Sequence, residues 1–216
     1  MKRLIKISIF CALMAGFVHL FVGQSFAALV LPVVPISQHF APIENGDSGA
    51  YDCTPSAYAM VLQTLQTEDK LKQGDFSYQT VRRTMRSVVT NSNEGIDLPI
   101  AVSLTPNLTN NQATSEIIQV DHTNWQQVLS QQLKEGKPVI VFLSDWNYLI
   151  ARGSSKQHVI MVSGISDSAV TFIDPWDGNT YQAPLDTFAY AWGSGNLPWY
   201  GVTFTTSTFL LSNRGV

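Results

Sequence analysis

The residue in this chain best suited to covalent chemistry is a cysteine at the start of an expected helix. Cys53 precedes Thr54 and Pro55, and apolar residues follow at helical spacing as far as Leu65. Pro55 suits the first helical position, which puts Thr54 at the N-cap. The positive end of the helix dipole would stabilise thiolate over thiol at Cys53, so this residue is a candidate nucleophile. The alternative is a small buried apolar residue, the more common fate of a lone cysteine.

A nucleophilic thiol needs a base, and the base needs an orienting partner. Of the four histidines, His158 opens an expected apolar strand directly after a loop, so it can face a cleft. His39 precedes a polar loop, His122 lies at a polar helix start where we expect it to be solvated, and His19 lies in an N-terminal targeting segment. His158 is therefore the candidate base, with a satisfied structural histidine as the alternative.

A carboxylate that could orient His158 ends the next expected strand. Asp174 follows the strand Ala169 to Ile173, and Ser166 to Ser168 is a hairpin-length connection between the two strands. If the strands pair as a tight hairpin, His158 and Asp174 come to the same end of the sheet. The carboxylate can then accept the Nδ1–H of the imidazole and stabilise the imidazolium. Asp174 can also make the turn before Pro175, and the two roles are compatible.

The elements that must position these residues run from helices in the first half to strands in the second. Polar residues indicate a surface loop over Thr105 to Ser115, and Thr123 to Gln126 matches a capping box. This order predicts an α+β fold in which a helical half packs on an antiparallel sheet. The expected helices are Cys53 to Thr67, Ser77 to Val89, a short helix after Asp97, a helix from Trp125 that Gly136 ends, and Leu185 to Trp192; the expected strands are Glu116 to Asp121, Pro138 to Leu143, His158 to Ile165, Ala169 to Ile173 and Trp199 to Leu211.

The first 27 residues have the pattern of a secretory signal peptide. A basic start, Met1 to Lys6, precedes an apolar run from Ile9 to Val22, and Ser25-Phe26-Ala27 offers small residues at the positions that a signal peptidase reads. The run is short for a membrane span, and an uncleaved anchor is the alternative. We therefore expect residues 1–27 to be removed and residues 28–216 to form a single secreted or periplasmic domain.

Cleavage also changes the charge and the cysteine count. Losing three basic residues leaves ten basic and sixteen acidic residues, a net charge of −6 instead of −3. An acidic surface argues against nucleic acid as a partner. Cys11 leaves with the signal peptide, so Cys53 remains as a lone thiol in a compartment where cysteines are usually paired. This count excludes cysteine-rich metal sites, and neither a metal nor a cofactor is implied.

Four segments, in this order, resemble the papain-like cysteine peptidases, and most closely the branch of bacteriocin leader (double-glycine) peptidases. Val34 to Gln38 resembles the lead-in that carries the oxyanion glutamine, and Asp52 to Ala57 resembles the Cys-Gly-Pro nucleophile motif with its helix. Gly136 to Val141 with Gln157 to Gly164 resembles the paired segments that carry the histidine, and Asp174-Pro175 resembles the Asp-Pro that closes the site. The resemblance covers about residues 34–178.

The resemblance implies a papain-like fold and a site made of Cys53, His158, Asp174 and Gln38. Cys53 would attack as thiolate, His158 would protonate the leaving amine, and Asp174 would orient His158. Gln38 and the backbone N–H of Cys53 would bind the oxyanion. Two departures stand out. Thr54 replaces the usual glycine, and the spacing from Gln38 to Cys53 is longer than in papain, so the loop between them must fold back.

We therefore expect an exported thiol hydrolase that cleaves peptide or amide bonds of a peptide or protein substrate through an acyl-enzyme. The same machinery serves amidases and acyl transferases, which the sequence does not separate from peptidases. A non-catalytic peptide-binding module on the same fold is a second class, and an exported structural protein with a buried free thiol is a third. No stable membrane span is expected after processing, and the oligomeric state is left open. Trp146 and Trp176 are candidate walls of the cleft.

Overall fold

The computed structural model describes residues 28–39, 49–89, 94–150, 157–193 and 199–207 of the 216-residue chain. The expected signal peptide, with Cys11 and His19, lies outside the described residues, and so do residues 40–48 of the loop before Cys53 and the end of the last expected strand. Within the described part, no helix combines the length and the apolar character that crossing a membrane requires.

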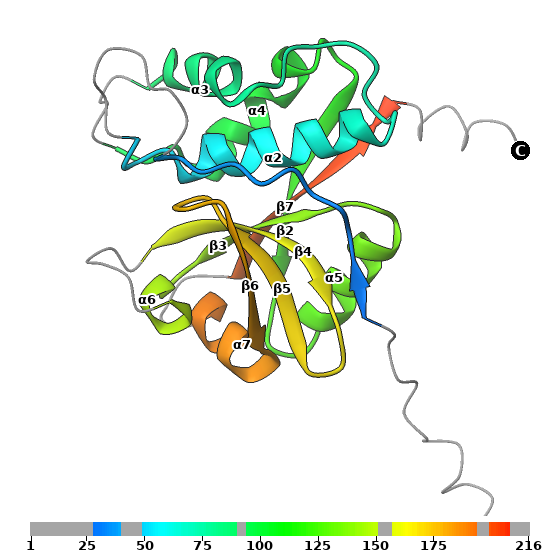
Figure 1. Ribbon diagram of the computed structural model, residues 1–216, viewed down its shortest axis with the longest axis vertical. Coiled ribbons are helices and arrows are strands. Elements are labelled where there is room, and N and C mark those ends of the chain that lie inside the picture. The colour runs from blue at the N-terminus through cyan, green and yellow to red at the C-terminus, as the bar shows by residue number, and fades with distance from the viewer. Residues whose placement is uncertain (1–27, 40–48, 90–93, 151–156, 194–198, 208–216) are drawn as a thin grey trace, which may run out of the picture.

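An antiparallel sheet of seven strands forms the centre of the described molecule (Figure 1). Its strands lie in the order β2-β7-β3-β4-β5-β6, and β1 pairs with one end of β4 beyond this path. Each pair of neighbouring strands is antiparallel, as the α+β prediction required. The strands are β1 (Leu29–Val30), β2 (Ala113–Val120), β3 (Val139–Leu143), β4 (His158–Ile165), β5 (Ala169–Asp174), β6 (Asn179–Pro184) and β7 (Trp199–Thr206).

Helices cover both faces of this sheet. Figure 1 shows α2, α3 and α4 together on one side of the sheet, and α5, α6 and α7 on the other. The first group is the helical half expected from the sequence, whereas the second group is interleaved with the strands along the chain. The helices are α2 (Cys53–Thr67), α3 (Tyr78–Arg86), α4 (Leu98–Leu108), α5 (Trp125–Lys134), α6 (Trp146–Leu149) and α7 (Leu185–Gly193).

Alternating side chains explain why β3 is buried on both faces. Val139, Val141 and Leu143 pack in a core with α5 and α7, whereas Ile140 packs in a second core with α2. The residues of β4 divide between the two cores in the same way. Because neighbouring side chains of a strand point to opposite faces, a continuous apolar run predicts burial on both sides, and the structure confirms this prediction.

The expectation of a loop over Thr105 to Ser115 is wrong. Helix α4 continues to Leu108, and β2 begins at Ala113. Thr105 and Thr109 are fully buried, and each hydroxyl donates to the backbone carbonyl four residues earlier. A polar segment can thus stay helical and buried when its hydroxyl groups find backbone acceptors.

The expected capping box at Thr123 is also wrong. Asn124 is the N-cap of α5 and makes no side-chain cap bond, while the hydroxyl of Thr123 donates to the carboxylate of Asp121. Gly136 follows α5 with a φ of 70°, the left-handed conformation expected after a helix end. Strand β6 and the short helix α6 were not predicted from the sequence.

The segment after β1 is fastened to the turn that follows Asp174. This segment runs between α2 and the sheet (Figure 1). The hydroxyl of Ser37 donates to the carbonyl of Trp176 at 3.1 Å, and the N–H of Gln38 donates to the carbonyl of Pro175 at 2.7 Å. Gly178 permits this close approach, because its φ is +73° and a Cβ there would lie 3.1 Å from the backbone nitrogen of Ser37.

Candidate active site

Helix α2 begins at Cys53, with Asp52 as its N-cap. The predicted N-cap at Thr54 is wrong, because the hydroxyl of Thr54 donates to the carbonyl of Ile96 at 2.9 Å and caps no N–H of its own helix. Cys53 is partly exposed and is not in a disulfide, although the helix behind it is largely buried. The thiol therefore lies at the positive end of a buried helix, a setting that favours thiolate.

His158 and Asp174 meet at one end of the hairpin formed by β4 and β5. Nε2 of His158 lies 2.7 Å from Oδ1 of Asp174. Met161 lies opposite Ile173 in the antiparallel pair, so His158 and Asp174 point to the same face of the sheet. The contact uses Nε2 and not the Nδ1 that we expected. The backbone N–H of Val159 also acts on the Cys53 sulfur, which places the thiol beside the β4 main chain, and Nδ1 is the ring nitrogen closer to that chain.

The thiol and the imidazole shift each other's pKa in the directions of an ion pair. Burial raises the pKa of Cys53, but the hydrogen bond and positive charge of His158, with the N–H groups of Val159 and Thr54, bring it below the ordinary value. Burial lowers the pKa of His158, but its hydrogen bonds with Asp174 and Cys53 outweigh burial and raise it to about 9. Between the two pKa values, the stable form of the pair is thiolate with imidazolium.

Gln38 reaches the loop in front of Cys53. Its side chain is fully buried, and its Nε2 donates to the carbonyl of Gly49 at 2.9 Å. The same carbonyl accepts the N–H of Asp52 at 3.0 Å. The described ends of this loop, at Gln38 and Gly49, therefore lie together, as the long spacing from Gln38 to Cys53 required. Oε1 of Gln38 has no hydrogen-bond partner among the described residues.

The sequence as a whole matches one family. The sequence model of the Peptidase_C39 like family aligns with residues 30–195, which is most of the chain and includes the four residues of the candidate site. The chain belongs to this family. The predicted kinship with the C39 branch of the papain-like cysteine peptidases is therefore confirmed, together with the α+β fold.

Two solved structures resemble the C39-like chain at low sequence identity. One, from Bacillus anthracis, is described as a C39-like peptidase; it is 16% identical, with a TM-score of 0.49 over 84% of this chain and 98% of the other. The second is the peptidase domain of Streptococcus ComA, a bifunctional ABC transporter involved in a quorum-sensing pathway. It is 18% identical, with a TM-score of 0.48 over 80% of this chain and 95% of the other. Among curated proteins, none matches this chain.

Trp146 belongs to the interior of the C39-like site and not to a wall of its cleft. Its side chain is 2% exposed, so the expectation of an open cleft wall is wrong for this residue. The indole stacks on the ring of His158 with centroids 4.2 Å apart, and its Nε1 donates to Oδ2 of Asp174 at 3.0 Å. The backbone N–H of Trp176 donates to Oδ1 of Asp174 at 2.9 Å. Asp174 thus contacts His158 and makes the turn at the same time.

The other described histidines have different surroundings. His39 packs edge-on against Trp176, with ring centroids 4.1 Å apart. His122 is exposed, as expected for a residue at a polar helix start. His158 is the histidine whose hydrogen bond and charge act on Cys53.

Sequence reasoning missed the buried carboxylate directly in front of Cys53. Asp52 is fully buried and forms ion pairs with Arg82 and Arg86 of α3. A signal was present, because Tyr78, Arg82 and Arg86 recur every four residues and so share one stripe of the helix. Three long side chains that can donate hydrogen bonds lie on one stripe of the helix, next to an apolar stripe that is buried. This arrangement indicates a buried hydrogen-bond acceptor.

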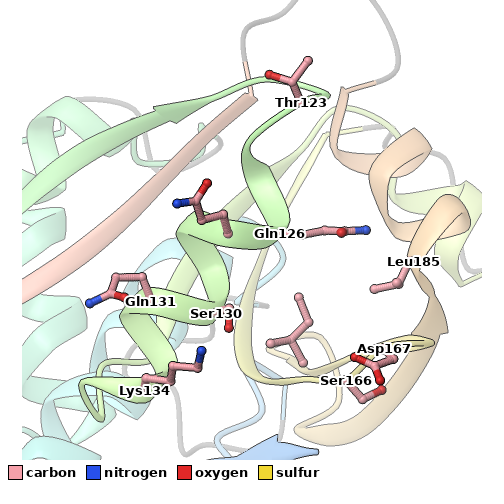
Figure 2. Close-up of a pocket in the computed structure, with 10 residues that line it drawn as sticks. Thr123, Gln126, Ser130, Gln131, Lys134, Ser166, Asp167 and Leu185 are labelled. Carbon is pink, nitrogen blue, oxygen red and sulfur yellow. The ribbon is translucent and has the colours of Figure 1, made fainter. Parts of the chain in front are cut away.

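A pocket of about 540 Å³ lies between α5, the turn that joins β4 to β5, and the start of α7. Figure 2 shows the residues that line it. Polar side chains line most of it, among them Gln126, Ser130 and Asp167. The turn lies at the opposite end of the hairpin from His158 and Asp174, and the eight residues of β4 span roughly 25 Å. This pocket is therefore separate from the candidate active site.

Proposed function

We propose that this C39-like protein is an exported cysteine peptidase that hydrolyses peptide bonds through an acyl-enzyme. The observation that carries the proposal is the contact of Cys53, His158 and Asp174, with the pKa of the thiol lowered and that of the imidazole raised. Peptide bonds are the preferred substrate because the family and the similar structures are described as peptidases. The acidic balance of the chain fits this choice better than nucleic acid.

In the proposed mechanism, the Cys53 thiolate attacks the carbonyl carbon of the scissile bond. The carbonyl oxygen takes the negative charge, and the N–H of Cys53 with the side-chain amide of Gln38 stabilises it. His158 then gives its Nδ1 proton to the leaving amine as the C–N bond breaks, while Asp174 holds the ring through Nε2. Water attacks the resulting thioester with His158 as the base, which releases the acid and restores the thiolate.

The test is the reactivity of Cys53, because it needs no knowledge of the substrate. An ordinary cysteine has a pKa of about 8.5, so well under about 1% is thiolate at pH 6. Iodoacetamide at pH 6 should alkylate Cys53 in the native protein about tenfold faster, or more, than in its urea-denatured chain. Mass spectrometry of the peptide that contains Cys53 measures both rates.

Two variants separate the ion pair from other influences on the thiol. His158→Ala should remove most of the rate advantage, because the imidazolium is lost while the helix end remains. The matched control is His122→Ala, which removes an exposed histidine and should change nothing. If native Cys53 reacts no faster than the denatured chain, the catalytic proposal fails, and a peptide-binding module on the same fold replaces it.

A further inference from the structure

Asp52 occupies the N-cap of α2 but does not cap the helix. An aspartate at this position normally accepts a hydrogen bond from the backbone N–H of the second or third helical residue. The Asp52 side chain makes no such bond, although it is fully buried one residue before Cys53. Because a buried carboxylate is costly without hydrogen bonds or ion pairs, Asp52 must have partners other than the N–H groups of α2.

Helix α3 supplies those partners. Nε of Arg82 donates to Oδ2 of Asp52 at 2.6 Å, and the hydroxyl of Tyr78 donates to the same oxygen at 3.1 Å. Arg86 contacts Oδ1 through both Nε, at 2.8 Å, and Nη2, at 2.6 Å. Arg86 also donates to the carbonyl of Tyr51 at 3.0 Å, so it binds the backbone directly before Asp52 as well as the Asp52 carboxylate. Each oxygen of the carboxylate is therefore bound to an arginine of α3.

The direction of this carboxylate decides which N–H groups remain open at the start of α2. The third helical residue is Pro55, which has no N–H. A capping Asp52 would therefore take the N–H of the second helical residue, Thr54. That same N–H donates to the Cys53 sulfur and helps to lower the thiol pKa. The carboxylate and the thiolate thus compete for one donor.

We propose that Asp52 is a positioning residue for Cys53, and that Arg82 and Arg86 retain its carboxylate so that the N-terminus of α2 stays open for the sulfur. The inference rests on the proposed function of Cys53 as a nucleophile. Released from the arginines, the carboxylate would turn to the N–H of Thr54 and bring a negative charge beside the thiolate. Both changes raise the thiol pKa. The groups that face this region are His158 from the sheet and Asp52, Tyr78, Arg82 and Arg86 from the helical layer.

The experiment compares a double variant with a triple variant. Arg82→Gln with Arg86→Gln frees the carboxylate, and the rate of Cys53 alkylation measured against pH should shift to higher pH by about one unit, a tenfold slower reaction at pH 6. Adding Asp52→Ala removes the carboxylate itself and should restore most of the rate. If the cluster of Asp52 and the two arginines has only a structural role, the result is the opposite. The triple variant regains no contact, so its Cys53 would be alkylated no faster than that of the double variant.

The matched control is Arg83→Gln, which removes the same charge from an exposed position of α3 and should leave the alkylation profile in place. Circular dichroism checks that each variant is folded. If the double variant does not fold, Arg82→Gln alone leaves Arg86 on Oδ1 and should give a smaller shift in the same direction, again reversed by Asp52→Ala. An unshifted profile in the folded arginine variants, or a triple variant that recovers nothing, overturns the inference.

The outcome also separates this inference from the proposed function. If the wild-type thiol is no faster than that of the denatured chain, the proposed function has failed. If the wild-type thiol is activated but the arginine variants leave it unchanged, only the role of Asp52 has failed.

Discussion

His158 uses its two ring nitrogens for two different partners, and this division determines what it can do. Nε2 is held by Asp174, and the flat face of the ring is covered by Trp146. Nδ1 is the nitrogen left to act on Cys53. Because Trp146 also donates to Asp174, the carboxylate cannot turn without breaking a second bond. The imidazole is thus fixed in position from the edge and from the face.

The pH dependence of hydrolysis should reflect this arrangement. His158 must be protonated to release the amine, and its pKa of about 9 places the alkaline limb of kcat/KM near that pH. The hydrogen bond to Asp174 raises this pKa, so Asp174→Asn should lower it and move the alkaline limb to lower pH, by about one unit or more. A pH–rate profile of the two proteins measures the shift. A limb that stays at the same pH in Asp174→Asn would contradict the role of this bond.

Gln38 should affect turnover more than substrate binding. If its side-chain amide stabilises the oxyanion, Gln38→Ala should lower kcat by roughly 10–10³ and leave KM nearly unchanged. Steady-state kinetics on a fluorogenic peptide measures both constants. The control is Gln127→Ala, an exposed glutamine of α5. Unchanged turnover in Gln38→Ala removes this residue from the site.

Single residues of the candidate site can be proposed from the sequence where residue type and order carry the information. Cys53, His158 and Asp174 are recognisable candidates because a thiol at a helix start, a histidine at a strand start and an aspartate at a strand end have characteristic local settings. The choice of Nε2 was not predictable, since it depends on the direction from which α2 approaches β4. The role of Trp146 was not predictable either, because its stacking on His158 is a tertiary contact between α6 and β4 that no local sequence pattern indicates.

At the scale of elements, periodicity predicted most helices and strands, and the errors fall mainly in polar segments. The hairpin of β4 and β5 was expected from two apolar runs with a short connection, and the structure confirms it. The end of α4 has the sequence of a loop because Thr105 and Thr109 are polar, yet both side chains are buried and hydrogen-bonded to backbone carbonyls. β6 was missed because its side chains are mostly exposed and lack an apolar pattern.

The contact between the turn at Gly178 and the segment after β1 should contribute to stability. In Gly178→Ala, the methyl group would lie about 3.1 Å from the nitrogen of Ser37, in a backbone conformation with positive φ. We expect a loss of about 1–3 kcal/mol in the free energy of unfolding. Gly95→Ala is the matched control, because a Cβ there meets nothing within 4 Å. Urea denaturation of both variants measures the difference, and equal losses would show that the contact is unimportant.

At the scale of the whole molecule, export should shorten the chain. The basic start, the apolar run and the small residues at Ser25 and Ala27 predict cleavage after Ala27. N-terminal sequencing of the protein recovered from outside the cytoplasm should begin at Ala28. An exported protein that still begins at Met1, isolated without detergent, would rule out this processing.

The site joins two halves of the fold that are far apart in sequence. Cys53 comes from the helices on one side of the sheet, and His158 comes from the sheet itself. In an unfolded chain the thiol has no imidazolium beside it and no helix end behind it, so it is an ordinary thiol. The reactivity proposed for Cys53 would thus be made by folding and be absent from the unfolded chain. The order of assembly therefore sets when the proposed chemistry can begin, because the thiol gains its imidazolium only after the helical layer has packed on the sheet.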